Sequence, residues 1–304
     1  MPRGPSATAP PRRVPVPREA AGERLDRFLA RALSLSPERA RRLAKDGRVR
    51  ARGKVCSPLR RLSGGEELEV RLPPPAPVRL APGDPPLLAL YDDAEVLVVE
   101  KPPGLAVEPG APGASSVVGA ASRLGRFDVA GRALPGLPHR LDRDTSGCLL
   151  LARTDGALSA LRRAFEEGQV EKEYLAVVSG DPPEALGLDT PYARSESDPR
   201  RFTTRRPSAR RARLSFRVAE RLAGAALLSV RLETGRTHQI RVQLAEAGWP
   251  VLGDPIYGVP SPRGGRQALH AARLAFPRPS DGRRIEVRSP LPKDLAALVR
   301  SLAR

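Results

Sequence analysis

The chain has 304 residues, of which 40% are hydrophobic and 28% charged, which is typical of globular proteins and leaves room for a large domain with a smaller one. Its net charge of +18 favours a polyanionic partner, nucleic acid first, although an Arg-rich coding bias would give the same excess. The sequence has no run of about 18 apolar residues, so no membrane span is expected.

The N-terminal stretch 1–17 (MPRGPSATAPPRRVPVP) lacks the apolar core of a signal peptide and is predicted to be a flexible basic tail. Cys56 and Cys148 lie far apart and form no CxxC pair. Their spacing argues against a zinc site and a disulfide framework, and it favours a reducing, cytoplasmic location.

Residues 18–72 are predicted to form the small domain. Apolar residues recur at helical spacing between 25 and 33. Ser36 and Pro37 then predict the start of a second helix, Gly47 predicts its end, and residues 68–72 alternate like a closing strand.

The basic charge is concentrated in this part of the chain. Residues 1–72 hold 18 Lys/Arg and 8 Asp/Glu, a net charge of +10. The second helix places basic residues opposite apolar ones. Such a face suits phosphate contacts, and a merely solvated face is the equally weighted alternative.

The Pro-rich residues 73–86 (PPPAPVRLAPGDPP) predict a linker, because Pro fixes φ and lacks the backbone donor. Residues 87–304 alternate strands with a few helices. Strands are expected over 96–99, 148–152, 173–178, 212–218 and 227–232, and helices over 154–168 and 237–247. This order predicts an α+β domain with a mixed, largely antiparallel sheet rather than a doubly wound one.

Three polar clusters stand out in the large domain: 139–147 (HRLDRDTSG), 172–174 (KEY) and 235–241 (GRTHQIR). Neither metal-ligand spacing nor a nucleotide-binding or nucleophile-elbow motif accompanies them, so we expect no metal and no cofactor. A carboxylate can act on a glycosidic bond directly, and a nearby Arg keeps a shielded carboxylate ionised. From the residues alone, a turn or capping role for such an Asp is the more frequent alternative.

Residues 139–152 (HRLDRDTSGCLLLA) resemble the signature of the RluA-type pseudouridine synthases. Segments 95–110, 172–180, 232–258 and 267–276 resemble further motifs of this family in the expected order. Residues 24–55 resemble an S4 RNA-binding domain, a small α/β domain that precedes the catalytic domain in many members.

The resemblance implies that the protein isomerises uridine to pseudouridine in structured RNA, with 23S-type ribosomal RNA as the expected substrate and no cofactor. Asp142 would be the nucleophile, or would assist elimination. Tyr174 would stack on the uracil and help to remove the C5 proton, and Arg236 would pair with Asp142 and keep it ionised. 

The same resemblance places Arg140 in the space that the target nucleotide leaves when it flips out of the RNA stack. Ile240 or Leu141 would pack against the base or support the pocket floor. Six basic residues of the S4-like domain are expected to contact the RNA backbone: Arg39, Arg41, Arg42, Lys45, Arg48 and Arg50.

Glu108 and Gln243 stand where many family members have His, and both are expected near the pocket rim, where they would affect substrate choice. Lys172 and Arg241 are expected to hold phosphate or to cover the sheet edge. Three histidines are predicted to be structural: His139, His238 and His270.

Two other functions remain open at this stage. One is a non-catalytic RNA-binding or ribosome-assembly factor that uses the same surfaces. The other is a tRNA-directed synthase with the same chemistry. The default expectation for the oligomeric state is a monomer.

Overall fold

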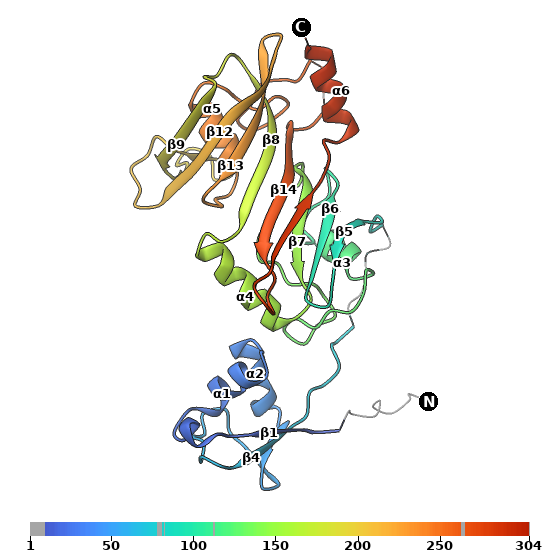
Figure 1. Cartoon of the computed structure of the whole chain (residues 1–304), viewed down its shortest axis with the longest axis vertical. Coiled ribbons are helices and arrows are strands. Elements are labelled where there is room, and N and C mark those ends of the chain that lie inside the picture. Colours follow the sequence, from blue (N-terminus) through green and yellow to red (C-terminus); the bar gives the residue numbers. More distant parts are fainter. Residues whose placement is uncertain (1–9, 78–80, 82, 112, 263–264, 304) are drawn as a thin grey trace.

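The computed structural model describes residues 10–77, 81, 83–111, 113–262 and 265–303. Residues 12–70 form a small N-terminal unit with its own apolar core, which lies beside one end of a larger unit (Figure 1). Its elements are β1 (Arg12–Pro15), a 3-10 turn (Arg18–Ala20), α1 (Leu25–Ala32), α2 (Pro37–Lys45), β2 (Val49–Ala51), β3 (Lys54–Val55) and β4 (Glu67–Val70). The strands form an antiparallel sheet in the order β1-β4-β2-β3.

The predicted start and end of α2 are confirmed. The Ser36 hydroxyl accepts a hydrogen bond from the Arg39 amide at 3.3 Å, and Pro37 is the first helical residue. Gly47 adopts a φ of +70° just after the helix, a conformation that favours glycine. Local sequence therefore sets the bounds of this helix.

The prediction of a flexible tail over 1–17 is wrong for residues 12–16. β1 pairs with β4, and Val14 and Val16 are buried in the core of the N-terminal unit. Pro15 is tolerated because β1 is an edge strand. Residues 1–9 of that tail and 78–80 and 82 of the predicted linker lie outside the described residues.

The larger unit, which begins at β5, is an α+β structure built on one large sheet, as predicted. Within the described residues nine strands join in the order β5-β6-β7-β14-β8-β13-β12-β9, with β15 paired to β14. Every pairing is antiparallel except β7 with β14. The strands are β5 (Leu88–Asp92), β6 (Val96–Lys101), β7 (Ser146–Ala152), β8 (Glu171–Ser179), β9 (Ala185–Pro191), β12 (Arg211–Leu222), β13 (Ala225–Leu232), β14 (Leu269–Pro277) and β15 (Arg284–Arg288), with β10 (Ala193–Arg194) and β11 (Phe202–Thr203) as a separate short pair.

Both faces of the sheet are covered at its β6–β7 side. Leu97 and Val99 of β6 share a core with α3 (Val117–Ala121), whereas Val96 and Val98 share another with α4 (Asp155–Glu166). Alternate side chains of a strand point to opposite faces, so a strand covered on both faces reads as a continuous apolar run. Thr154 caps α4 by accepting a hydrogen bond from the Ala157 amide at 3.1 Å.

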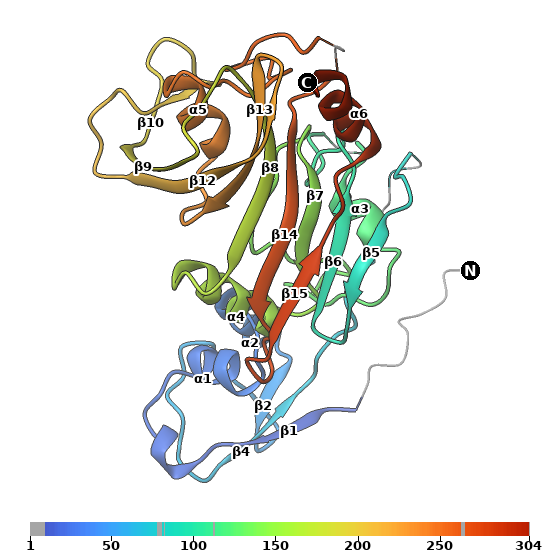
Figure 2. The same ribbon diagram turned by 45° about the horizontal axis from the view of Figure 1, so that its top comes forward.

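The other half of the sheet carries α5 (Gln239–Glu246), and α6 (Lys293–Leu302) lies near the same end of the molecule (Figure 2). Residues 239–244 of α5 are all buried, so the helix is enclosed rather than amphipathic. Within the described part of the chain no helix combines the length and apolarity that crossing a membrane requires.

Candidate active site

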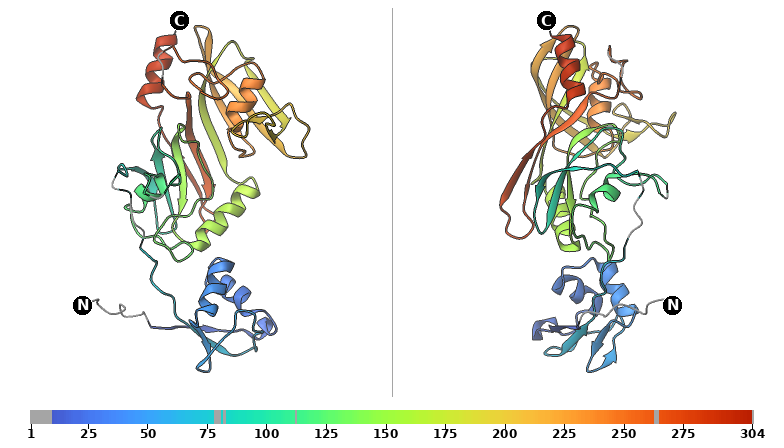
Figure 3. Two further views of the ribbon diagram at one scale, coloured as in Figure 1. Left: turned by 180° about the vertical axis from the view of Figure 1, so that it is seen from behind. Right: turned by 90° about the vertical axis from the view of Figure 1, so that its right-hand side faces the viewer.

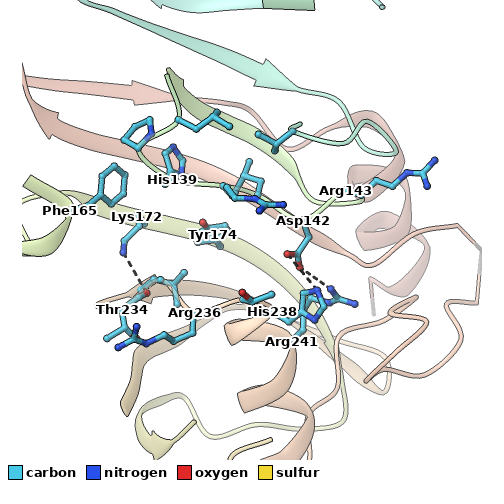
Figure 4. Close-up of a pocket in the computed structure, with 18 of the residues that line it drawn as sticks. His139, Asp142, Arg143, Phe165, Lys172, Tyr174, Thr234, Arg236, His238 and Arg241 are labelled. Atoms are coloured by element: carbon cyan, nitrogen blue, oxygen red, sulfur yellow. Dashed lines mark hydrogen bonds and ion pairs between the residues drawn. The ribbon is translucent and has the colours of Figure 1, made fainter. Parts of the chain in front are cut away.

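A cavity of about 1320 Å³ opens between the loop that precedes β7, the last turn of α4, strand β8 and the segment that leads into α5. All three polar clusters identified in the sequence line it. Figure 4 shows Asp142, Tyr174 and Arg241 around its centre and Lys172 with Phe165 farther along. The fold therefore brings together segments that lie about a hundred residues apart.

Asp142 stands in the loop directly before β7, and its carbonyl accepts the Thr145 amide at 3.1 Å. Its carboxylate is 23% exposed, so it reaches the cavity while remaining partly shielded from water. The Oδ2 atom accepts a hydrogen bond from Arg241 Nη1 at 2.8 Å. The Oδ1 atom lies 3.9 Å from His238 Nε2, and no donor of the described residues hydrogen-bonds it.

The arginine that pairs with Asp142 is Arg241, and the prediction of Arg236 is wrong. Arg236 lies in the turn before α5, where its Nε donates to the Arg211 carbonyl at 3.3 Å, although it does line the cavity. The helix begins at Gln239 instead of 237, preceded by His238 with a φ of +59°. This late start gives Arg241, in the first turn of the helix, the position facing Asp142.

Arg241 is held from behind by Asp254. Its Nε and Nη2 donate to the two Asp254 oxygens at 2.6 and 2.8 Å, and the Asp254 side chain is fully buried. Burial alone would raise the pKa of Asp254, but the Arg241 guanidinium holds it below its usual range. Both carboxylates outweigh the burial of Arg241 and raise its pKa, so the guanidinium stays charged and aimed at Asp142.

Tyr174 lies on β8 and is 7% exposed, with its ring in the main core of the larger unit. Burial, followed by the negative charge of Asp142, raises the pKa of its phenol well above the ordinary value of 10.0. The hydroxyl therefore stays protonated near neutral pH. Tyr174 lines the same cavity as Asp142 (Figure 4) and offers it an aromatic ring with a hydroxyl group.

His238 completes the polar surroundings of Asp142. Its Nδ1 lies 3.1 Å from the Tyr257 hydroxyl. Burial lowers the pKa of His238, which favours the neutral ring next to the carboxylate. The structural role predicted for the histidines accounts for the other two: His139 Nε2 accepts the Leu150 amide at 2.9 Å, and His270 joins Ser146 and Ser289.

The remaining predicted pocket residues divide into surface and core. Arg140 is exposed at the cavity edge, 3.7 Å from Glu108. Leu141 and Ile240 are 7% and 3% exposed and belong to the main core, from which they support the neighbouring Asp142 and Arg241. The expectation that Gln243 lies at the rim is wrong, because its buried amide donates to Thr190 and Ala212.

The far end of the cavity carries both basic and acidic side chains. Lys172 Nζ lies 5.8 Å from the centre of the Phe165 ring and 3.5 Å from the Thr234 carbonyl (Figure 4). Burial lowers the pKa of Lys172. Arg213 and Arg236 line the same region together with Glu166, Glu167 and Glu233, and Arg213 pairs with Glu233 at 3.2 Å.

The predicted RNA contacts of α2 and β2 are only partly available. Arg39 is buried and pairs with Asp128 and Asp155 of the larger unit, so the prediction that Arg39 contacts RNA is wrong. Arg42 donates to the Ala130 carbonyl at 2.5 Å. Arg41, Lys45 and Arg50 are exposed, and Arg48 is half-buried.

Across the described parts of the chain, no group of three or more His, Cys, Asp or Glu side chains is placed to hold a metal ion. The cavity presents a carboxylate held by a guanidinium, a neutral phenol and several basic side chains. This set is suited to acid–base and nucleophilic work on a polyanionic substrate.

Comparisons with known proteins agree on one family. A family model described as RNA pseudouridylate synthase matches residues 95–246. An uncharacterized RNA pseudouridine synthase of Chloroflexus aurantiacus is 39% identical over 95% of this chain and 93% of its own length. A ribosomal large subunit pseudouridine synthase D of Xanthomonas campestris is 37% identical over 96% of this chain and 92% of its own.

A solved structure titled human RNA pseudouridylate synthase domain containing 1 has the same fold, with a TM-score of 0.56 and 25% identity over 71% of this chain and 94% of its own. The chain belongs to the RNA pseudouridylate synthase family. It is an RNA pseudouridine synthase, an isomerase, and the RluA-type family predicted from residues 139–152 is confirmed.

Proposed function

We propose that this enzyme modifies uridines of large-subunit ribosomal RNA. The names of several relatives support this substrate, including the 37% identical synthase of Xanthomonas campestris and a 34% identical one of Escherichia coli, both called ribosomal large subunit pseudouridine synthase D. The net charge of +18 suits such a polyanion.

Asp142 is the proposed catalytic carboxylate. The observation that carries this assignment is its ion pair with the buried Arg241 at 2.8 Å, which holds the partly shielded carboxylate in place at the cavity. The reaction breaks the bond between uracil N1 and ribose C1′, turns the base and forms the bond between C5 and C1′. The C5 proton leaves and N1 gains one, so no redox partner is needed.

Tyr174 is proposed to stack on the turning uracil and to help transfer the C5 proton, because its protonated phenol faces the same cavity. Arg140, exposed at the rim, is proposed to fill the gap left by the flipped nucleotide. The Arg241 guanidinium takes the role that the sequence had assigned to Arg236, and Arg236 is proposed to contact RNA phosphate.

The N-terminal unit is proposed to be an S4-like RNA-binding domain. Its helix pair, its small sheet and its basic side chains support this assignment; Arg41, Lys45 and Arg50 are exposed, and Arg48 is half-buried. The protein is further proposed to act as a cytoplasmic monomer, a location with which its two free, buried cysteines agree.

The decisive experiment compares wild type with Asp142→Asn on unmodified large-subunit ribosomal RNA. Asn keeps the size of the side chain but cannot act as a nucleophile, so pseudouridine formation should stop while RNA binding persists. Pseudouridine is measured by mass spectrometry of the digested RNA. An equal yield from both proteins would remove Asp142 from the mechanism, and activity on transfer RNA alone would overturn the proposed substrate.

A further inference from the structure

Arg39 of α2 is the most deeply buried of the described arginines that connect the two units. Its side chain is 3% exposed, with Nη1 3.1 Å from Asp155 Oδ2 and Nη2 2.8 Å from Asp128 Oδ2. The Asp155 side chain is 2% exposed. Neither carboxylate is near Arg39 in the sequence, and the proposed chemistry uses none of the three groups.

The contacts around Arg39, Asp128 and Asp155 form a closely packed interface, the seam, between the two units. Arg42 donates to the Ala130 carbonyl. A Cβ added to Gly156 would meet the Ser34 Cβ at 3.0 Å, and one added to Gly131 would meet Arg42 Nη2 at 3.2 Å. Gly156 therefore lets the two chains approach closely at Ser34, and Gly131 leaves room for the Arg42 side chain.

The segment that joins the two units is fastened to the same place. The Ala76 amide donates to the Gly131 carbonyl at 2.9 Å, and the Ala133 amide donates to the Ala76 carbonyl at 3.0 Å. This part of the predicted linker consequently runs along the seam instead of standing away from the protein. The ribbon views agree that α2 lies next to α4 at the end of the large sheet (Figure 2, Figure 3).

Helix α4 connects the seam to the active site. Asp155 is its first residue, while Arg162 and Phe165, near its other end, line the cavity that holds Asp142. A helix of 12 residues spans about 18 Å. The N-terminal unit is therefore held about one helix length from the cavity.

We propose that Arg39, Asp128 and Asp155 form a latch that holds the N-terminal unit at one set position, and that this position selects which uridine reaches Asp142. The inference rests on the proposed RNA binding by the N-terminal unit. An apolar seam can slide, whereas a planar guanidinium between two carboxylates fits in one orientation. A position of the N-terminal unit that separated Arg39 from the buried Asp155 would leave an uncompensated buried charge and is therefore disfavoured. Arg39 is thus a positioning residue that does not touch the RNA.

The test begins with Arg39→Met, which keeps the length of the side chain and removes its charge. Arg31→Met is the matched control, because Arg31 is an exposed arginine of the same unit whose ion pair with Glu23 stays inside that unit. Small-angle X-ray scattering reports the positions of the two units without RNA, and circular dichroism reports folding. Pseudouridines are then mapped along unmodified large-subunit ribosomal RNA.

Arg39→Met should broaden the scattering-derived distance distribution and spread modification to additional uridines. If the set position falls to a tenth of the population, modification of the preferred uridine falls about tenfold relative to the others. Modification of a short stem-loop that reaches only the cavity should stay at the wild-type rate. Arg31→Met should match wild type in every assay.

A disulfide across the seam provides the rescue. Ser34→Cys with Gly156→Cys places two Cβ atoms 3.0 Å apart, and a slight widening brings them to the roughly 3.5–4.5 Å that a disulfide needs. The native Cys56 and Cys148 are buried and do not compete. In the Arg39→Met background, oxidation should restore the wild-type site preference, and reduction should remove it.

Three outcomes would overturn the latch: an unchanged modification map for a folded Arg39→Met protein, an unchanged scattering profile, or an oxidised protein that remains unselective. Failure of the RNA-binding proposal looks different. In that case neutralising Lys45, Arg48 and Arg50 would leave RNA affinity unchanged, whatever Arg39→Met does.

Discussion

The substitution Asp254→Asn tests how Asp254 orients the Arg241 side chain toward Asp142. Asp254 accepts Arg241 Nε and Nη2 with both oxygens, and its Oδ1 also accepts the Ile256 and Tyr257 amides. An Asn side chain of the same size has one acceptor oxygen, and its amide group would face the guanidinium donors. At least one charge-assisted hydrogen bond is lost, and such bonds contribute about 1.5–3 kcal/mol.

The loss should appear in the rate of the chemical step. If that energy holds Arg241 toward Asp142, its removal lowers kcat by about ten- to a hundredfold, since each 1.36 kcal/mol corresponds to a factor of ten. KM for RNA should change little, because Asp254 is fully buried and cannot contact the substrate. The carboxylate at 142 is retained, so activity should fall without vanishing.

Single-turnover release of tritium from RNA labelled at uridine C5 measures this step. Asp181→Asn serves as the control, because it also removes a carboxylate paired with an arginine, Arg221, but at a site where the Asp181 side chain is 88% exposed. Thermal denaturation shows whether each variant is folded. A folded Asp254→Asn protein with the wild-type rate would refute the reasoning.

Three further predictions follow from other parts of the molecule. Gly147→Ala should lower the free energy of unfolding by about 3 kcal/mol in denaturant titrations, because the new Cβ would lie 2.2 Å from the Ala271 carbonyl oxygen at a φ of +112°, whereas Gly224→Ala has open space and should cost less. Burial lowers the pKa of His139 from 6.5 to about 3, so the ring gains a proton on unfolding and the free energy of unfolding falls as the pH drops below about 6.5. In melting curves, His139→Gln should remove about 1 kcal/mol of this loss between about pH 7.5 and 5.5. Identical pH slopes for wild type and variant would contradict this. Replacing the three basic residues Lys45, Arg48 and Arg50 by Ala should reduce the slope of log affinity against log salt by about 2 in filter binding. An unchanged slope would exclude them from the RNA interface.

Features fixed by local chemistry were predictable from the sequence. The caps at Ser36 and Thr154 follow from a hydroxyl that accepts a nearby amide, and the strand at 96–99 follows from an unbroken apolar run. The proximity of Asp142 to Tyr174 followed from the family resemblance, because their motifs are far apart in the sequence. These predictions needed either a few adjacent residues or a known arrangement of motifs.

Features set by helix phase or distant partners were not predictable. Choosing between Arg236 and Arg241 depends on where α5 begins, and a shift of two residues rotates the helix by more than half a turn. The signal that was available is Asp254 in the GDP segment, a carboxylate close enough in sequence to hold Arg241. Arg39 resembled any other basic residue of an exposed helix face, because its partners lie 89 and 116 positions away.

The position of β14 also determines when the enzyme can become active during synthesis. β14 lies between β7, which follows the Asp142 loop, and β8, which carries Tyr174, although it is made after both. Until residues 269–277 have left the ribosome, the two halves of the catalytic sheet have no strand to join them. A nascent chain therefore carries every proposed catalytic side chain before it has an active site, and pseudouridine formation begins only once the C-terminal strand is inserted.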